Sequence, residues 1–330
     1  MNSTQETEPL WTVLSIFYTV TNVIIFILGV AGNGLVIWIA GFKMKRSVIS
    51  IWYLSLAVSD FLFCSFLPFN IVYIVKREWF LGDFMCKLMF FSMYFNWFSS
   101  IFLLVIISVD RCVVVMFPVW AQNKRTVRKA SVIVMLAWII SAAYCLPSTI
   151  SQEVQQDDHQ ETKFFFYNYS NSQEHTADVT CDFIIGFVIP FLIIVICYVV
   201  IIRKLKPTKM AKSKKPFKIM TALIASFFVC WLPYHIFALM ELNYTKYPHF
   251  IISGSTIALI LANASSCLNP LLYAFMGKDF KRQCYALLTK IENAIEDEED
   301  KSTLRGTGTT STGESKLSTA NNLNSSLEQC

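Results

Sequence analysis

Seven long apolar segments constrain this chain more than any other feature of its sequence. They lie at about 15–41, 49–74, 85–116, 129–149, 182–204, 216–240 and 250–276. Each is near or above the roughly 20 residues that a helix needs to cross the hydrocarbon core of a bilayer. The composition agrees, because 55% of the 330 residues are hydrophobic and only 15% are charged, against about 25% charged in soluble proteins. The sequence therefore predicts an all-α membrane protein, a bundle of seven transmembrane helices.

Basic residues predict the orientation of this bundle. The first, third and fifth connections, with the adjoining ends of the segments, contain fifteen Lys and Arg, and those on the opposite side contain five. An excess of Lys and Arg marks the cytoplasmic side, so we expect a plasma-membrane protein with its N-terminus outside and its C-terminus inside. The first residues, MNSTQETEPL, have no positively charged stretch. We therefore expect no cleavable signal peptide, and a first helix that serves as the signal anchor.

The regions that flank the bundle carry candidate modification sites. We expect an extracellular segment at 1–14, the transmembrane domain at 15–276, an amphipathic helix on the inner membrane surface at 277–291, and a disordered cytoplasmic tail at 292–330. Cys284, in the surface helix, is a candidate for palmitoylation. Three Asn-x-Ser/Thr sequons on the expected outer side are candidate glycosylation sites: Asn2, Asn168 and Asn243.

Asp60 is the only acidic residue near the middle of a segment. A carboxylate in hydrocarbon costs several kcal/mol unless it is paired or hydrated, so intramembrane acids mostly mark functional sites. Oxygen atoms around one acid suit a small hard cation, and sodium is the ion that we expect. The simpler alternative is that Asp60 only hydrogen-bonds a neighbouring helix. Residues at similar depth that could join it are Asn33, Asn96, Ser100, Ser265, Ser266 and Asn269.

Three segments contain an internal proline. Pro190, Pro233 and Pro270 lie within the fifth, sixth and seventh segments. Each removes a backbone donor and is expected to kink its helix, which neighbouring helices and waters tolerate. A bundle with several kinked helices rocks more readily than one of straight helices, although prolines are also common in membrane helices without any such role.

Several short motifs occur along the segments, each in a different segment. The third segment ends in Asp110-Arg111-Cys112, and the seventh contains Asn269-Pro270-Leu-Leu-Tyr273. The other matches are Gly32-Asn33, Leu56-Ala57-x-x-Asp60, Trp138 and Cys230-Trp231-Leu-Pro233. Together they resemble the signature of rhodopsin-like G-protein-coupled receptors, with Cys112 where that family has Tyr. The likeness covers about residues 12–290.

This resemblance implies a set of switch residues. Arg111 would be held by Asp110 at rest and turn inward on activation, near Tyr198 and Tyr273. Trp231 would be the pivot that senses the ligand, and Asn269 with Pro270 would belong to the same switch.

The resemblance also implies partners on the inner side. Val119, which follows Pro118, would enter a pocket on the Gα subunit of a heterotrimeric G protein. The Ser/Thr-rich stretch 301–330 would be phosphorylated by receptor kinases and then dock on arrestin, because clustered phosphates form a flexible polyanion. We expect the basic loops to contact the G protein and anionic lipid rather than nucleic acid.

Within the receptors, the segments FPVWAQNKR, KKPFKI, YHIFALMEL and FMGKDFKR resemble the chemerin and formyl-peptide group of chemoattractant receptors. That likeness implies an extracellular peptide or protein ligand, inhibitory G proteins and leukocyte migration. Formyl-peptide receptors place arginines at the start of the fifth helix, where this chain has Asp178 and Asp182. An acidic mouth of this kind attracts cationic ligands. We expect the ligand-sensing residues to be Asp182, Trp231, His235 and Glu241.

The resemblance breaks at one disulfide. Cys86 matches the cysteine that normally bridges to the second extracellular loop, but aromatic residues in KFFFYNYSNSQ stand where its partner is expected. Cys181 is the other cysteine on the outer side. A disulfide needs Cα atoms within about 7 Å, so the sequence leaves open whether Cys86 pairs with Cys181 or is free.

Other classes of protein fit the sequence less well. A light sensor of this fold needs a lysine in the seventh segment, and 250–276 has none. A transporter or channel usually has internal repeats or several charged residues within its spans. The four histidines lack metal-ligand spacing, and we expect neither an enzyme nor a cofactor apart from allosteric sodium. The remaining alternative is an orphan or scavenging receptor with little G-protein coupling.

Overall fold

The computed structural model describes residues 3–156, 163–167, 172–205, 214–242, 248–276, 282–286, 289 and 293. The chain divides into two compact units, Met1–Gln283 and Cys284–Cys330. Within the described residues, seven helices are long and apolar enough to cross a membrane, and all belong to the first unit. They span Trp11–Lys43, Val48–Lys76, Gly82–Met116, Val127–Ile150, Ser172–Lys204, Met220–Glu241 and Phe250–Tyr273. The predicted seven-helix membrane fold is confirmed.

The elements follow one another in a simple order. They are α1 (Ser3–Trp38), the π-helical turn η1 (Ile39–Lys43), α2 (Val48–Lys76), α3 (Gly82–Met116), α4 (Pro118–Lys124), α5 (Val127–Ile150), β1 (Gln152–Gln156), β2 (Lys163–Tyr167), α6 (Ser172–Phe183), the π-helical turn η2 (Ile184–Val188), α7 (Ile189–Leu205), α8 (Lys214–Glu241) and α9 (Pro248–Met276). The first helix is already helical from Ser3, within the stretch that we expected to be an extracellular segment.

The fifth span begins ten residues earlier than its hydropathy indicates. The structure has helix from Ser172, whereas the apolar segment begins at about 182. The extra turns are α6, whose sequence SQEHTADVTCDF is too polar to be recognised as part of a membrane helix. The π-helical turn η2 then leads into Pro190, so the irregular backbone lies directly before the residue that lacks a donor.

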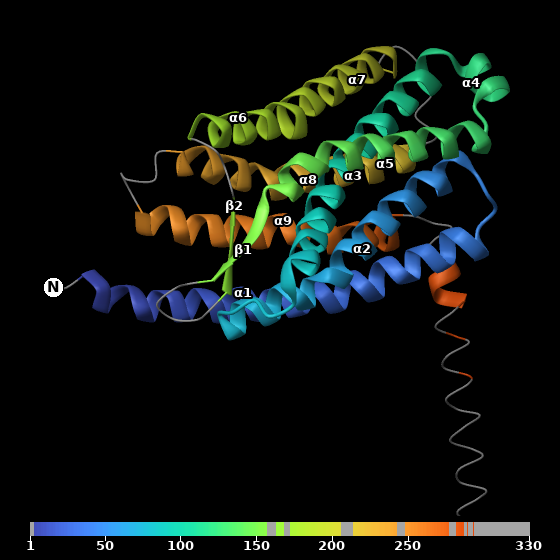
Figure 1. Ribbon diagram of the computed structural model, residues 1–330. Helices are drawn as coiled ribbons and strands as arrows, with labels where there is room; N and C mark the ends of the chain where they lie inside the picture. The colour runs from blue at the N-terminus through green and yellow to red at the C-terminus, as the bar shows by residue number, and fades with distance from the viewer. Residues whose placement is uncertain are drawn as a thin grey trace, which may run out of the picture. The chain divides into compact units, whose positions relative to one another are not determined.

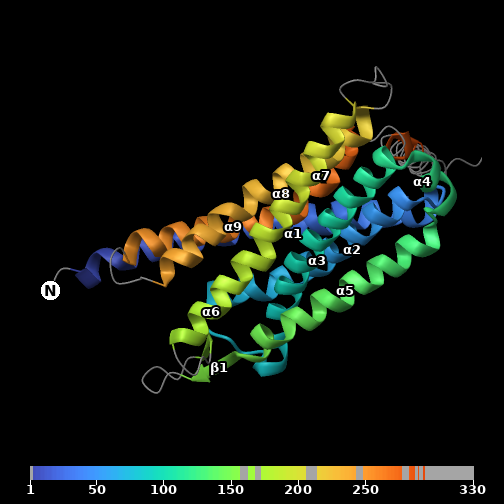
Figure 2. The same ribbon diagram turned by 90° about the horizontal axis from the view of Figure 1, so that it is seen from above.

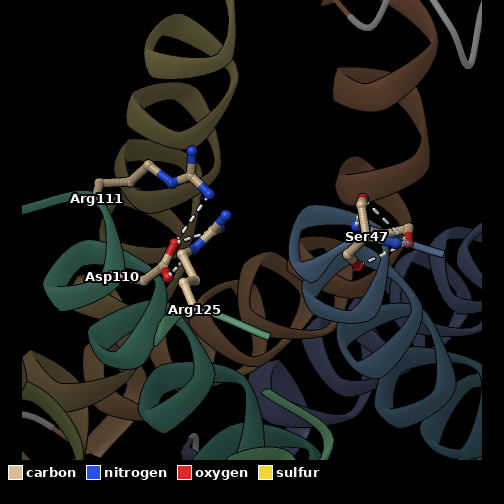
Figure 3. A network of polar contacts seen from close by, with 5 residues as sticks. Ser47, Asp110, Arg111 and Arg125 are labelled. Carbon is tan, nitrogen blue, oxygen red and sulfur yellow. Dashed lines mark hydrogen bonds and ion pairs between the residues drawn. The ribbon is translucent and has the colours of Figure 1, made fainter. Parts of the chain in front are cut away.

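Local sequence signals account for several helix starts. Ser47 caps α2 through a reciprocal pair of hydrogen bonds with Ser50, which satisfies donors that the first turn leaves open (Figure 3). Pro118 occupies the first turn of α4, where its missing N–H costs nothing. Thr126 caps α5 by accepting a hydrogen bond from the backbone N–H of Lys129 at 3.3 Å.

Helix α3 occupies the middle of the bundle. It lies against α2, α5, α7 and α8, while α1 lies against α2 and α9 (Figures 1 and 2). The short helix α4 and the hairpin β1–β2 are at opposite ends of α3 (Figure 2). Because α3 touches helices on several sides, its polar residues meet partners from distant parts of the sequence.

The hairpin β1–β2 is held by apolar contact instead of a disulfide. Strands β1 and β2 pair antiparallel, with Val154 opposite Phe165, and the sequence did not predict them. Val154 contacts the buried cluster of Trp79, Cys86 and Met89. Cys86 is a fully buried free thiol, and Cys181 is an exposed free thiol on α6. Of the two alternatives that the sequence left open for Cys86, the structure has the free thiol, and the Cys86–Cys181 disulfide is not formed.

Little of the predicted inner surface helix and tail is described. Residues 282–286 are helical, and Cys284 within them is partly buried, which raises the pKa of its thiol. Palmitoylation of Cys284 stays a prediction. The sequons Asn2, Asn168 and Asn243 and the hydroxyl-rich stretch 301–330 lie outside the described residues.

Candidate functional site

The carboxylate of Asp60 is the centre of a buried polar network. Asp60 on α2 is 1% exposed. Asn96 on α3 donates its side-chain amide to Oδ1 of Asp60 at 2.8 Å, and Asn269 on α9 donates to Oδ2 at 2.7 Å. Three helices that are far apart in sequence thus meet at one acid, as expected for a charge that hydrocarbon would otherwise leave unsolvated.

The network extends from Asp60 to the first helix. The Ser266 hydroxyl donates to Oδ1 of Asn96 at 3.0 Å, and the Asn33 amide on α1 donates to the backbone carbonyl of Ser266 at 2.9 Å. The motif residues Asn33, Asp60 and Asn269 therefore belong to one connected set. Gly32 allows α1 to approach α9, because a Cβ there would lie 3.0 Å from Cβ of Pro270.

Two further residues of the expected sodium set are placed differently. The Ser265 hydroxyl accepts a hydrogen bond from Nε1 of Trp231 at 3.2 Å. The hydroxyl of Ser100 is buried and has no hydrogen-bond partner among the described residues. Ser100 lies one helical turn after Asn96 on α3, so an unsatisfied oxygen is available close to the network. Carboxylate, amide and hydroxyl oxygens are the ligands of a hard cation, and this set fits sodium.

An aromatic cluster lies beside this polar network. The rings of Trp97 on α3 and Trp231 on α8 stack with centroids 4.9 Å apart and planes 12° apart. Phe227 stacks on Trp231, with the two ring centroids 5.7 Å apart. Both tryptophans line, together with Asn96, a cavity of about 10 Å³, which is about the space of one water molecule. Trp97 was missed by the sequence interpretation, because an aromatic residue in an apolar segment carries no signal of its own.

His235 is packed inside the same cluster. It is 2% exposed, and its ring centroid lies 5.1 Å from Trp97, 5.5 Å from Phe183 and 4.9 Å from Phe187. Its Nε2 is buried without a hydrogen-bond partner among the described residues. The imidazole therefore presents one unsatisfied nitrogen in an otherwise aromatic cage that connects α3, α6, η2 and α8.

A chain of contacts leads from the outer acidic residues to Trp231. The Tyr144 hydroxyl donates to Oδ1 of Asp182 at 3.4 Å. The Tyr144 ring lies 4.4 Å from Phe98, and Phe98 lies 4.5 Å from Trp97, measured between centroids. Trp97 in turn stacks on Trp231. Asp182, near the end of α6, is thus connected side chain by side chain to the residue expected to sense the ligand.

The other two acidic residues near this end are Asp178 and Glu241, and they differ in their contacts. The Ser148 hydroxyl on α5 donates to Oδ1 of Asp178 at 3.3 Å. Glu241 is exposed at the last position of α8 and has no ion pair within the described part of the chain. Of the expected ligand-sensing residues, Asp182, His235 and Trp231 lie in or along the contact chain, whereas Glu241 lies apart.

Asp110 at the other end of α3 holds two arginines. Nη2 of Arg111 lies 2.9 Å from Oδ2 of Asp110. Arg125, which follows α4, makes a two-point contact, with Nε 2.6 Å from Oδ1 and Nη2 2.8 Å from Oδ2 (Figure 3). Paired N–H donors on one carboxylate give strong, directional ion pairs. The contact from Arg125 was missed, because nothing local in a basic loop indicates which cation will reach the acid.

The other inner switch residues lie on neighbouring helices. The Tyr198 hydroxyl on α7 accepts a hydrogen bond from Thr221 on α8 at 3.3 Å. The buried ring of Tyr273 on α9 lies 4.5 Å from the ring of Tyr53 on α2. Val119 on α4 is 71% exposed and points its apolar side chain away from the core. An exposed valine beside the ion-paired end of α3 is suited to contact a partner.

Comparison with known proteins agrees with this architecture. The family described as "7 transmembrane receptor (rhodopsin family)" matches residues 32–273. Human "Chemerin-like receptor 1" is 41% identical over 304 residues, covering 87% of this chain and 82% of the relative. Human "N-formyl peptide receptor 3" is 37% identical over 335 residues and covers 94% of each chain.

The chain therefore belongs to the rhodopsin family of seven-transmembrane receptors. It is a multi-pass membrane protein and a receptor rather than an enzyme. Membership implies an extracellular ligand at one end of the bundle and a heterotrimeric G protein at the other. The predicted resemblance, including the likeness to chemerin and formyl-peptide receptors, is confirmed.

Proposed function

We propose that this receptor responds to a cationic chemoattractant peptide or protein of the chemerin type and signals through inhibitory G proteins. The observation that carries the proposal is the contact chain from Asp182 through Tyr144, Phe98 and Trp97 to Trp231. The excess of basic residues at the α4 end supports an orientation in the plasma membrane with that end in the cytoplasm and the N-terminus outside.

The charge at the mouth selects between the two kinds of relative. A formylated peptide ends in a carboxylate, which two acids near the start of the fifth span would repel, whereas a basic ligand would be attracted. Asp178 and Asp182 therefore favour a ligand of the kind that the chemerin-like relatives are named for. The relative identities, 41% and 37%, are too similar to make this choice alone.

The direct test on the ligand side is charge reversal. Asp182→Arg should lower the potency of a chemerin-type polypeptide in a cAMP inhibition assay by at least about tenfold, because it replaces an attraction by a repulsion at the first member of the contact chain. Glu174→Arg is the matched control, since Glu174 lies two turns earlier on α6 and is exposed. Equal potency shifts in both variants would mean that only the general field of the mouth matters.

The inner end supports coupling to a G protein. On activation Arg111 would leave Asp110 and turn toward Tyr198 and Tyr273, while Val119 enters an apolar pocket on Gα. Arg111→Ala should abolish ligand-stimulated nucleotide exchange and leave ligand binding intact. Arg46→Ala, which removes a charge from the first basic loop, measures how much of the loss comes from the general charge of the loops. A normal response from the Arg111 variant with normal binding would favour the alternative, a scavenging receptor that binds ligand with little coupling.

Sodium would act at the Asp60 network. Asp60, Asn96 and Ser100 would supply oxygens, with Ser265, Ser266 and Asn269 supporting them, and a cation bound there would stabilise the resting arrangement of α2, α3 and α9. Asp60→Asn should remove any effect of sodium on agonist affinity, measured against the same concentration of a large organic cation. A sodium effect of unchanged size would leave Asp60 as a hydrogen-bond partner only.

Shut-off would depend on the tail. Receptor kinases would phosphorylate the hydroxyls between 301 and 330, and arrestin would bind the resulting polyanion. Truncation after Lys301 should leave the first G-protein response unchanged and slow internalisation.

The proposed topology also includes covalent modifications on both sides of the membrane. We propose glycosylation at Asn2, Asn168 and Asn243 and palmitoylation at Cys284. Mobility shifts after enzymatic deglycosylation test the first, and mobility shifts after thioester cleavage test the second.

A further inference from the structure

A groove with an unusual mixture of side chains lies at the α4 end of the bundle. It has a volume of about 350 Å³ and is lined by residues from α2, α3, α4 and α5. Its walls are apolar, with Val105, Ile106 and Val109 from α3 and Ile133 from α5. One rim is basic and consists of Lys124, Arg125 and Lys129.

The groove continues toward the middle of the bundle as a purely apolar channel. A second cavity of about 380 Å³ shares Val105, Ile106 and Ile133 with the first and is lined only by apolar residues of α3 and α5, which run side by side in Figure 2. Eleven residue steps separate Phe102 from Val113 on α3, and at about 1.5 Å each this is roughly 16 Å. That length is about half of the roughly 30 Å hydrocarbon core, or one leaflet.

The channel opens to the surface of the bundle along α5. Ile133, Leu136 and Ile140 are 41%, 52% and 57% exposed. In a membrane these residues face lipid, because the described helices leave that side of α5 uncovered. A molecule could therefore enter the groove sideways from the bilayer, with its apolar part along α3 and α5.

Two of the three basic residues of the rim have no ion pair among the described residues. Arg125 is already neutralised by its two-point contact with Asp110. Lys124 and Lys129 are exposed and have no ion pair among the described residues. Two unneutralised cations at the mouth of an apolar channel favour an amphiphile with an anionic head.

Trp52 supplies a second, independent indication of a ligand. It lines the groove and is 2% exposed, yet its indole N–H has no hydrogen-bond acceptor among the described residues. An unsatisfied buried donor costs about 1–3 kcal/mol. An oxygen of a bound head group or ester would satisfy it.

We propose that this groove binds an anionic phospholipid of the leaflet at the α4 end, with its phosphate at Lys124 and Lys129 and one acyl chain along α3 and α5. Under the orientation proposed above this is the cytoplasmic leaflet, in which anionic lipids are concentrated. Arg125 is shared between the rim and Asp110, so a phosphate bound at the rim adds a second anion beside the guanidinium that holds Asp110.

Photolabelling of the full-length receptor tests the site directly. The receptor is placed in phosphatidylcholine nanodiscs that contain phosphatidylserine with a photoreactive group in its acyl chain. Both leaflets are accessible there, so the result does not depend on the orientation or on the ligand of the receptor. Label is expected in the peptides that cover Phe102–Val113 and Lys129–Ile140. A phosphatidylcholine probe with the same acyl group should label them much less.

Three variants separate the parts of the proposal. Lys124→Gln with Lys129→Gln should weaken binding about 25-fold, since each basic residue near an anionic surface contributes about fivefold. Trp52→Phe should weaken it about fivefold, the value of one hydrogen bond. Ile133→Trp should exclude the acyl chain while the rim charges stay. Lys43→Gln with Lys45→Gln is the matched control, because it removes two charges outside the groove and should reduce labelling of the two peptides much less.

Four outcomes would overturn the proposal. Equal labelling by both probes would make the groove a general lipid contact, and equal losses in both double-lysine variants would leave only surface charge. Full competition by inorganic phosphate would indicate a soluble anion. Absence of lipid label, together with receptor-to-receptor links in the same two peptides after treatment with a bifunctional cross-linker, would assign the groove to a second copy of the chain.

Discussion

The middle of α3 and its α4 end hold their functional residues by opposite means. Near the middle and outer half, Trp97 is 2% exposed and is fixed by ring contacts with Trp231, Phe98 and His235. At the inner end, Asp110 is fixed by ion pairs whose side chains are 12–22% exposed. The first arrangement depends on shape and volume, and the second depends on charge.

This difference separates the two regions by experiment. Contacts between rings gain from close approach and tolerate neither a cavity nor an added atom. Ion pairs that water reaches weaken with salt, because mobile ions screen partly exposed charges. A variant of the aromatic cluster should therefore be sensitive to side-chain size and insensitive to salt, and a variant of the inner ion pairs should behave in the opposite way.

The largest effect is expected from Trp97→Ala. Removing a buried indole leaves a cavity among Trp231, Phe98 and His235, and the free energy of unfolding should fall by about 3–5 kcal/mol. Thermal unfolding of the purified receptor in detergent measures it. Trp120→Ala, at a 55% exposed position on α4, is the control and should have little effect.

Gly186→Ala tests how tightly the aromatic cluster around Trp97 is packed. A Cβ at this position of η2 would lie 2.7 Å from Cζ2 of Trp97, so the ring or the helix must move, at a cost of about 1–3 kcal/mol. Gly34→Ala is the matched control, because its Cβ would make an ordinary contact at 3.5 Å with Phe61. Equal stability of the two variants would mean that Trp97 is not tightly packed.

Asp110→Ala tests the charge side. Arg111 and Arg125 would lose their common carboxylate, and stability should fall by about 1–2 kcal/mol, less than for a fully buried pair because water reaches all three side chains. The difference from the unmodified receptor should shrink as salt is raised. A salt-independent loss would contradict an electrostatic role. Freed Arg111 should also raise ligand-independent nucleotide exchange.

The smallest effect is expected at the hydrogen bond between Ser265 and Trp231, which is a polar contact of the aromatic cluster. Ser265→Ala removes the hydroxyl that accepts from Nε1 of Trp231 at 3.2 Å and should cost about 1 kcal/mol. Ser226→Ala is the control, since the Ser226 hydroxyl only donates to a carbonyl of its own helix. The ligand potency of the Ser265 variant should change as well, because Trp231 loses its only polar anchor toward α9 among the described contacts.

The seven helices and the polar motif residues could be predicted because their signals are local. A hydrophobic segment of sufficient length is apparent without knowledge of its neighbours, and an acid within it is costly wherever the helix lies. Asp60 was therefore predicted as a centre, and its hydrogen bonds with Asn96 and Asn269 join residues that the sequence placed at similar depth. The polar start of α6 at Ser172 and the helical start of α1 at Ser3 were missed, because hydropathy does not detect polar turns that extend a membrane helix.

The tertiary structure decided the pairings. Three contacts join side chains that are many residues apart in the sequence. Trp97 stacks on Trp231, Arg125 rather than another loop cation reaches Asp110, and Val154 covers a free Cys86. Hydropathy and charge act along the chain and determine which segments enter the membrane. The choice of partner depends on distances of a few ångströms between helices, and those distances exist only once the bundle is assembled.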